Sequence, residues 1–129
     1  EIMLKYLSKF LIKKNFVITT AMNGNDALEI IKKQDFIVVL LDVLMPGMDG
    51  IETLKEIKKI KPITEVIMLT GHASLQVAMQ GMKLGAFDYL MKPFDQYKLL
   101  EKLQMACEKR MFNEKGIDGV NIPEMTPSK

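Results

Sequence analysis

The chain has 129 residues, of which 18 are Lys or Arg and 16 are Asp or Glu. These opposite charges are too evenly balanced to predict electrostatic binding to nucleic acid. Its 48% apolar content and single cysteine are typical of one globular domain from a reducing compartment, so we expect a cytoplasmic location and exclude an intrachain disulfide. No apolar run is long enough to span a bilayer, which predicts a protein that does not bind a membrane.

The chain alternates between helix-like and strand-like patterns. A first helix is expected before Asn15, and a last helix from the cap Asp95 to about Arg110. Beyond Arg110, glycines and prolines predict a tail or linker, so we expect one domain over residues 1–110 and a tail over residues 111–129. Four short strands are expected over residues 16–20, 36–41, 64–69 and 87–91. Three further helices are expected over residues 25–33, 50–60 and 75–84, with the caps Asn25 or Asp26, Asp49 and Ser74 and the stop Gly85.

Helices that alternate with strands are typical of crossover connections between parallel strands, so the pattern predicts a doubly wound α/β fold. Residues 36–41 are six consecutive apolar residues, rich in β-branched side chains, which favours a strand buried on both faces. Asp42 follows this run directly. It is therefore expected at the edge where open α/β sheets bind their ligands.

Polar residues follow three of the expected strands, namely Asp42, Thr70 and Lys92. Because the carboxyl ends of parallel strands share one edge of the sheet, we expect these side chains to converge. A carboxylate can accept a phosphoryl group when a divalent cation neutralises the crowded charge. A lysine and a threonine hydroxyl can hold phosphoryl oxygens, and Gly71 would leave room for the group beside the backbone. The combination predicts a site that forms and senses an acyl phosphate.

Three segments resemble motif blocks of the receiver domains of two-component response regulators. They are residues 41–50 (LDVLMPGMDG), 66–73 (VIMLTGHA) and 85–94 (GAFDYLMKPF), which stand in the family's order. The resemblance extends from residue 1 to about residue 110, and residues 71–73 and 78–86 favour the nitrogen-regulator branch. It implies a flavodoxin-like sheet with the strand order 2-1-3-4-5.

The resemblance also implies the roles of the site residues. Asp42 would accept a phosphoryl group from a sensor histidine kinase, and Asp42 with the backbone carbonyl of Leu44 would bind Mg²⁺. Thr70, Gly71 and Lys92 would contact the phosphoryl oxygens. The output surface would lie on residues 74–107. A downstream output domain or protein, or a second copy in a homodimer, would bind there.

Two further residues and one peptide bond close to the expected site carry further expectations. Tyr89 matches the family's switch aromatic, with a plain core aromatic as an equal alternative. His72 would tune the access of water to the phosphoryl group, with an ordinary exposed loop histidine as the alternative. The Lys92–Pro93 peptide is expected to be cis.

The chain departs from the family at its beginning. The family's first strand ends in an acidic pair that supplies most of the Mg²⁺ site, and no such strand precedes Glu1. That strand would lie centrally, between residues 16–20 and residues 36–41. We therefore expect the polypeptide to continue upstream or another chain to supply the strand. As written, the chain should bind Mg²⁺ weakly.

Two other functions compete with a phosphorylation switch. A pseudo-receiver would keep the fold as a phosphorylation-independent interaction scaffold, and the missing acidic pair supports it. A haloacid-type phosphatase also uses an Asp after a buried strand, but it needs a second Asp two residues later, where this chain has Leu44. We therefore expect no enzyme, but a phosphoacceptor domain that takes part in its own phosphotransfer and dephosphorylation.

Overall fold

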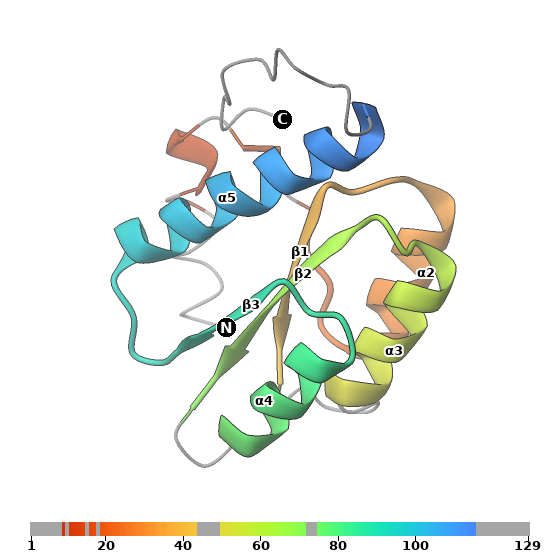
Figure 1. Ribbon diagram of the computed structural model, residues 1–129, viewed down its shortest axis with the longest axis horizontal. Coiled ribbons are helices and arrows are strands. Elements are labelled where there is room, and N and C mark those ends of the chain that lie inside the picture. Colours follow the sequence, from red (N-terminus) through yellow and green to blue (C-terminus); the bar gives the residue numbers. More distant parts are fainter. Residues whose placement is uncertain are drawn as a thin grey trace.

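The computed structural model describes residues 9, 11–14, 16–17, 19–43, 50–71 and 75–115. Helices and strands alternate along the chain (Figure 1). The helices are α2 (Gly24–Lys33), α3 (Gly50–Ile60), α4 (Leu75–Lys83) and α5 (Gln96–Lys115). The strands are β1 (Val38–Asp42), β2 (Glu65–Thr70) and β3 (Asp88–Met91).

The three strands form a parallel sheet in the order β1-β2-β3. In the register, Asp42 lies opposite Leu69, and Thr70 lies opposite Met91. Figure 1 shows α5 on one side of the sheet and α2, α3 and α4 on the other. This doubly wound arrangement confirms the predicted fold class.

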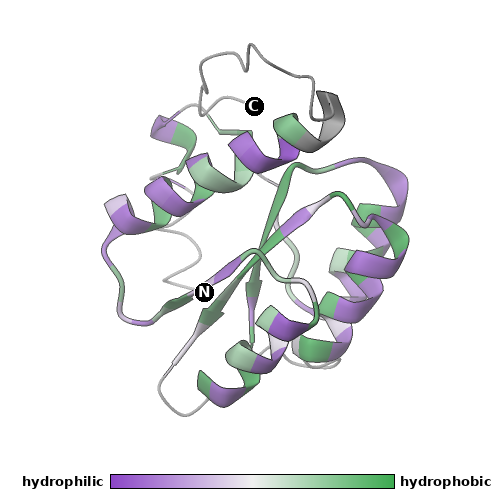
Figure 2. Ribbon diagram, in the orientation of Figure 1, coloured by the Kyte–Doolittle hydropathy of each residue, from purple (hydrophilic) through white to green (hydrophobic). Residues whose placement is uncertain are grey.

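Apolar clusters cover both faces of the sheet, because successive side chains of a strand point to opposite faces. The cluster on the α5 side consists of Leu11, Ile67, Leu69, Leu90, Leu99, Leu103 and Ala106. The cluster on the other side consists of Leu28, Ile31, Leu41, Val43, Leu54, Ile57, Val66, Met68 and Ala86. Figure 2 shows mainly hydrophobic strands and helices that alternate between hydrophobic and hydrophilic faces. None of the helices in the described ranges has both the length and the apolar character that a bilayer crossing requires.

The helix ends follow local sequence signals. Asn23 caps α2, ahead of the expected caps Asn25 and Asp26, and its side chain accepts a hydrogen bond of 2.9 Å from the Asp26 amide. Gly85 follows α4 with a φ of +107°, the left-handed conformation predicted for this stop. At the start of α5, the Asp95 side chain accepts a hydrogen bond of 2.8 Å from the amide two residues later, which confirms that cap. The expected caps Asp49 and Ser74 lie outside the described residues.

Helix α4 lies close against β2 at Gly81. A Cβ atom added there would lie 2.3 Å from Sδ of Met68 and 3.3 Å from Cδ2 of Leu54. Both neighbours are fully buried, at 0% exposure. Only a glycine allows α4 to approach the strand that carries Thr70 this closely.

Two expectations about the elements are wrong. The described residues of the expected strand 16–20 do not belong to the sheet, and Val17 is 84% exposed. A strand needs a hydrogen-bonded neighbour, and no described strand lies between this segment and β1 to provide one. Helix α5 runs past its expected end at Arg110 to Lys115, because residues 111–115 contain no glycine or proline. The rest of the expected tail lies outside the described residues.

Candidate functional site

The carboxyl ends of the three strands bring the predicted polar residues to one edge of the sheet. Asp42 ends β1, Thr70 ends β2, and Lys92 directly follows β3. The Lys92 amide donates a hydrogen bond of 2.6 Å to the Thr70 carbonyl oxygen, which continues the β2–β3 pairing up to this point. The Lys92–Pro93 peptide is cis, as predicted.

Lys92 and Asp42 form an ion pair across this edge. The Lys92 Nζ donates a hydrogen bond of 2.7 Å to Oδ2 of Asp42. The side chains are 30% and 32% exposed, so solvent reaches both groups. The predicted convergence therefore holds for these two residues. The pair puts a nucleophilic oxygen and a cation within one hydrogen bond of each other, on the open end of the sheet.

Thr70 is buried, at 1% exposure, and its hydroxyl is turned toward its own backbone. The Oγ1 donates a hydrogen bond of 3.1 Å to the Gly71 carbonyl oxygen. A Cβ atom added to Gly71 would meet no described residue within 4 Å, so the described part of the chain leaves open space beside the backbone at this point. A hydroxyl on a local backbone bond next to open space can rotate toward a new acceptor.

Tyr89 lies in β3 opposite Met68 of β2 and is half-buried. Its side chain packs against the apolar cluster between the sheet and α2 and α3. The packing agrees with the core alternative and leaves the switch role a prediction. Leu44 and His72, the other two residues predicted for the site, lie outside the described residues.

Sequence reasoning assigned no role to Glu65, at the opposite end of β2. This carboxylate is 2% exposed and begins β2, which is the one described strand in which every residue is buried. The available signal was a charged residue directly before an uninterrupted apolar run. Glu65 was predicted only as part of the strand over residues 64–69.

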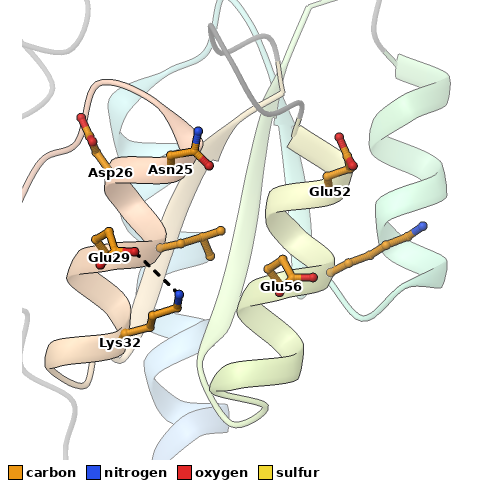
Figure 3. A pocket seen from close by; sticks show the side chains of 8 residues that line it. Asn25, Asp26, Glu29, Lys32, Glu52 and Glu56 are labelled. Carbon is orange, nitrogen blue, oxygen red and sulfur yellow. Dashed lines mark ion pairs between the residues drawn. The ribbon is translucent and has the colours of Figure 1, made fainter.

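A mixed-charge groove of about 530 Å³ lies between α2 and α3 (Figure 3). Its lining includes Asp26, Glu29, Lys32, Glu52, Lys55 and Glu56. Within it, Glu29 and Lys32 pair at 3.7 Å as neighbours on one helix. None of the three strand-end residues lines this groove, so the candidate site is the strand edge.

The match to a family model decides the classification. Residues 1–104 match the model described as the response regulator receiver domain. The chain belongs to this family. A receiver domain is the phosphoacceptor module of two-component signalling, and this assignment agrees with the polar residues at the strand ends.

ZraR and NtrX-like relatives support the assignment of this receiver domain to the nitrogen-regulator branch. The transcriptional regulatory protein ZraR of Escherichia coli strain K12 is 40% identical over 112 residues, which are 87% of this chain and 24% of ZraR. A putative NtrX-like response regulator of Rickettsia typhi strain Wilmington is 38% identical over 100 residues, covering 76% of this chain and 21% of that protein. The crystal structure of the NtrX receiver domain from Brucella abortus has a TM-score of 0.76 at 30% identity, covering 80% of this chain and 88% of that one. The chain thus spans about a quarter of the length of ZraR.

Receiver domains in general bind Mg²⁺ at an acidic pocket, and Mg²⁺ prefers an octahedral shell of oxygen ligands. At the carboxyl ends of the three described strands, Asp42 is the single carboxylate, and Lys92 already contacts its Oδ2. Within the described ranges, no group of three or more His, Cys, Asp or Glu residues could hold a metal ion. The described residues alone therefore do not fit a Mg²⁺ site.

Proposed function

We propose that Asp42 is the phosphoacceptor of this receiver domain and that Lys92 and Thr70 hold the phosphoryl oxygens. The contact of 2.7 Å between Lys92 Nζ and Asp42 Oδ2 carries the proposal. An Asp42 oxygen would bond to phosphorus as the P–N bond of a phosphohistidine breaks. The new phosphoryl oxygens would then lie within reach of the same ammonium group, a compact cation suited to phosphate.

The switch would act through Thr70. Its hydroxyl would leave the Gly71 carbonyl oxygen, 3.1 Å away, for a phosphoryl oxygen on Asp42. A bond to a charged acceptor is stronger than a bond between neutral groups, so the exchange is favourable. Tyr89 would follow this movement from its half-buried position beside the core cluster.

The proposed output surface is formed by residues 74–107, which contain α4, β3 and the first twelve of the 20 residues of α5. Met79 is 52% exposed, Met82 is 36% exposed and Met105 is 53% exposed. Flexible apolar side chains of this kind suit a surface that adapts to a partner. A downstream output domain or protein would bind there, or a second copy in a homodimer.

A sensor histidine kinase in the cytoplasm would supply the phosphoryl group, and neither nucleic acid nor a membrane would bind this chain. Carboxylates from outside the described residues would complete the Mg²⁺ site. The receiver domain would span residues 1–110 and take part in its own phosphotransfer and dephosphorylation, with no other catalysis.

Phosphorylation by a small donor tests the role of Asp42. Acetyl phosphate with Mg²⁺ should add one hydroxylamine-sensitive phosphoryl group, measured by intact mass. Asp42→Asn should abolish the gain in mass. Asp35→Asn, which removes an exposed Asp close to the start of β1, is the matched control and should leave it unchanged. Full labelling of Asp42→Asn would exclude Asp42. A wild-type chain that stays unlabelled but still binds its partner would favour the scaffold alternative.

A further inference from the structure

The last turns of α5 contact the amino ends of the strands, at the edge opposite Asp42 and Lys92. Arg110 is 7% exposed, and its Nη1 donates a hydrogen bond of 2.7 Å to the carbonyl oxygen of Phe36, just before β1. The hydroxyl of Thr64, just before β2, donates to the same oxygen at 2.9 Å. One carbonyl group therefore connects α5 to the beginnings of two strands.

Lys109 extends these contacts to β2 and β3. Its Nζ lies 3.6 Å from Oε1 of Glu65, the first residue of β2, and 5.6 Å from the ring centroid of Phe87, just before β3. The Glu65 side chain is 3% exposed, and its Oε1 has no hydrogen-bond partner among the described residues. A buried carboxylate oxygen without a hydrogen bond is unfavourable unless positive charge lies close to it.

Glu65 receives positive charge from both sides of the sheet. Lys58, in α3, donates hydrogen bonds to the carbonyl oxygens of Pro62 at 2.8 Å and Thr64 at 2.9 Å. Burial lowers the pKa of Lys58, and the negative charge of Glu65 acts in the opposite direction. Lys109 approaches the same carboxylate from α5. The negative charge of Glu65 thus attracts lysines from helices on both sides of the sheet.

We propose that Lys109 and Arg110 anchor the last turns of α5 to the amino edge of the sheet, so that the chain leaves the domain in a fixed direction. The anchor consists of the contacts of Lys109 with Glu65 and Phe87 and of Arg110 with Phe36. Helix α5 continues from the anchor to its end at residue 115, so a helical segment follows the anchor directly. Any part of the protein attached beyond this helix would be oriented by the anchor. The proposal does not depend on phosphoryl transfer.

Amide hydrogen exchange of the full chain tests the anchor. Arg110→Met removes the charge and the donor but keeps an apolar side chain of similar length. The amides of residues 107–112 should then exchange about tenfold faster, the effect expected from the loss of a charged hydrogen bond. Arg110→Lys keeps a charge and a donor and should restore part of the protection. If Arg110→Met does not fold, Lys109→Met carries the same expectation for the same amides.

Ile57→Val is the matched control. Ile57 is fully buried in α3, on the other side of the sheet, and its truncation should lower the folding equilibrium about threefold to tenfold. It should accelerate exchange in β2 and leave residues 107–112 unchanged. The anchor is refuted if these residues are unaffected by Arg110→Met. It is also refuted if Ile57→Val accelerates them equally, because the end of α5 would then open only together with the whole domain.

Discussion

Gly81→Ala should destabilise this domain, although alanine is the better helix former. Alanine in the middle of α4 gains about 1 kcal/mol of helix propensity. The added Cβ, however, would lie 2.3 Å from Sδ of Met68, and the sulfur must retreat by about 1.2 Å to reach an ordinary contact distance. Because Met68 is fully buried, this movement disturbs the core at a cost of about 2 kcal/mol. The expected net loss is about 1 kcal/mol.

A double-mutant cycle measured by urea denaturation separates the two effects. Met68→Ala removes the obstructing sulfur, so in that background Gly81→Ala should raise the free energy of unfolding by about 1 kcal/mol. The sign of the effect should therefore reverse between the two backgrounds. Gln80→Ala, at an exposed neighbour in α4, is the control and should change stability by less than about 0.5 kcal/mol. A stabilising Gly81→Ala in the wild type, or the same effect in both backgrounds, would refute the close approach of α4.

Lys92, Lys61 and Cys107 are the side chains behind three further predictions. Lys92→Met should lower the free energy of unfolding by about 1 kcal/mol or less, because the pair with Asp42 is about one-third exposed, and a much larger loss in urea denaturation would contradict this. Lys61 holds the pKa of Asp35 below its ordinary 3.8, so the stability from this pair is present above that pH and is lost as the pH falls through the folded pKa. Below pH 3.8, the free energy of unfolding of Asp35→Asn should therefore fall less steeply with decreasing pH than that of the wild type, as measured by acid unfolding. Burial raises the pKa of the Cys107 thiol, so it should react with a disulfide reagent far more slowly in the native chain than in urea; equal rates would argue against burial.

The features predicted correctly from the sequence depend on local rules. Residues 36–41 and 64–69 read as buried strands because short β-branched runs have few alternatives, and both contain strands of the sheet. Gly85 was predicted from the need for a left-handed residue after α4. The convergence of Asp42 and Lys92 followed from topology alone, since parallel strands end at one edge.

Two of the three failures concern contacts between distant parts of the chain. Residues 16–20 have the composition of a strand, but a strand forms only when another strand pairs with it. The burial of Glu65 could not be read from its neighbours, because the cations that compensate it come from α3 and α5. The length of α5 was underestimated because the apolar pattern weakens after Arg110, whereas the helix continues to Lys115.

The ion pair of Asp42 and Lys92 also sets the net charge that these two residues place at the carboxyl edge of the sheet. With Lys92 positive and Asp42 negative, the resting pair has no net charge. An aspartyl phosphate carries about two negative charges at neutral pH, so the pair with Lys92 would become negative by about one charge. The Thr70 hydroxyl contributes only a dipole and cannot neutralise that excess. Among the described residues, the resting pair is therefore electrically balanced, and phosphorylation would turn it into an attractor for one more cation.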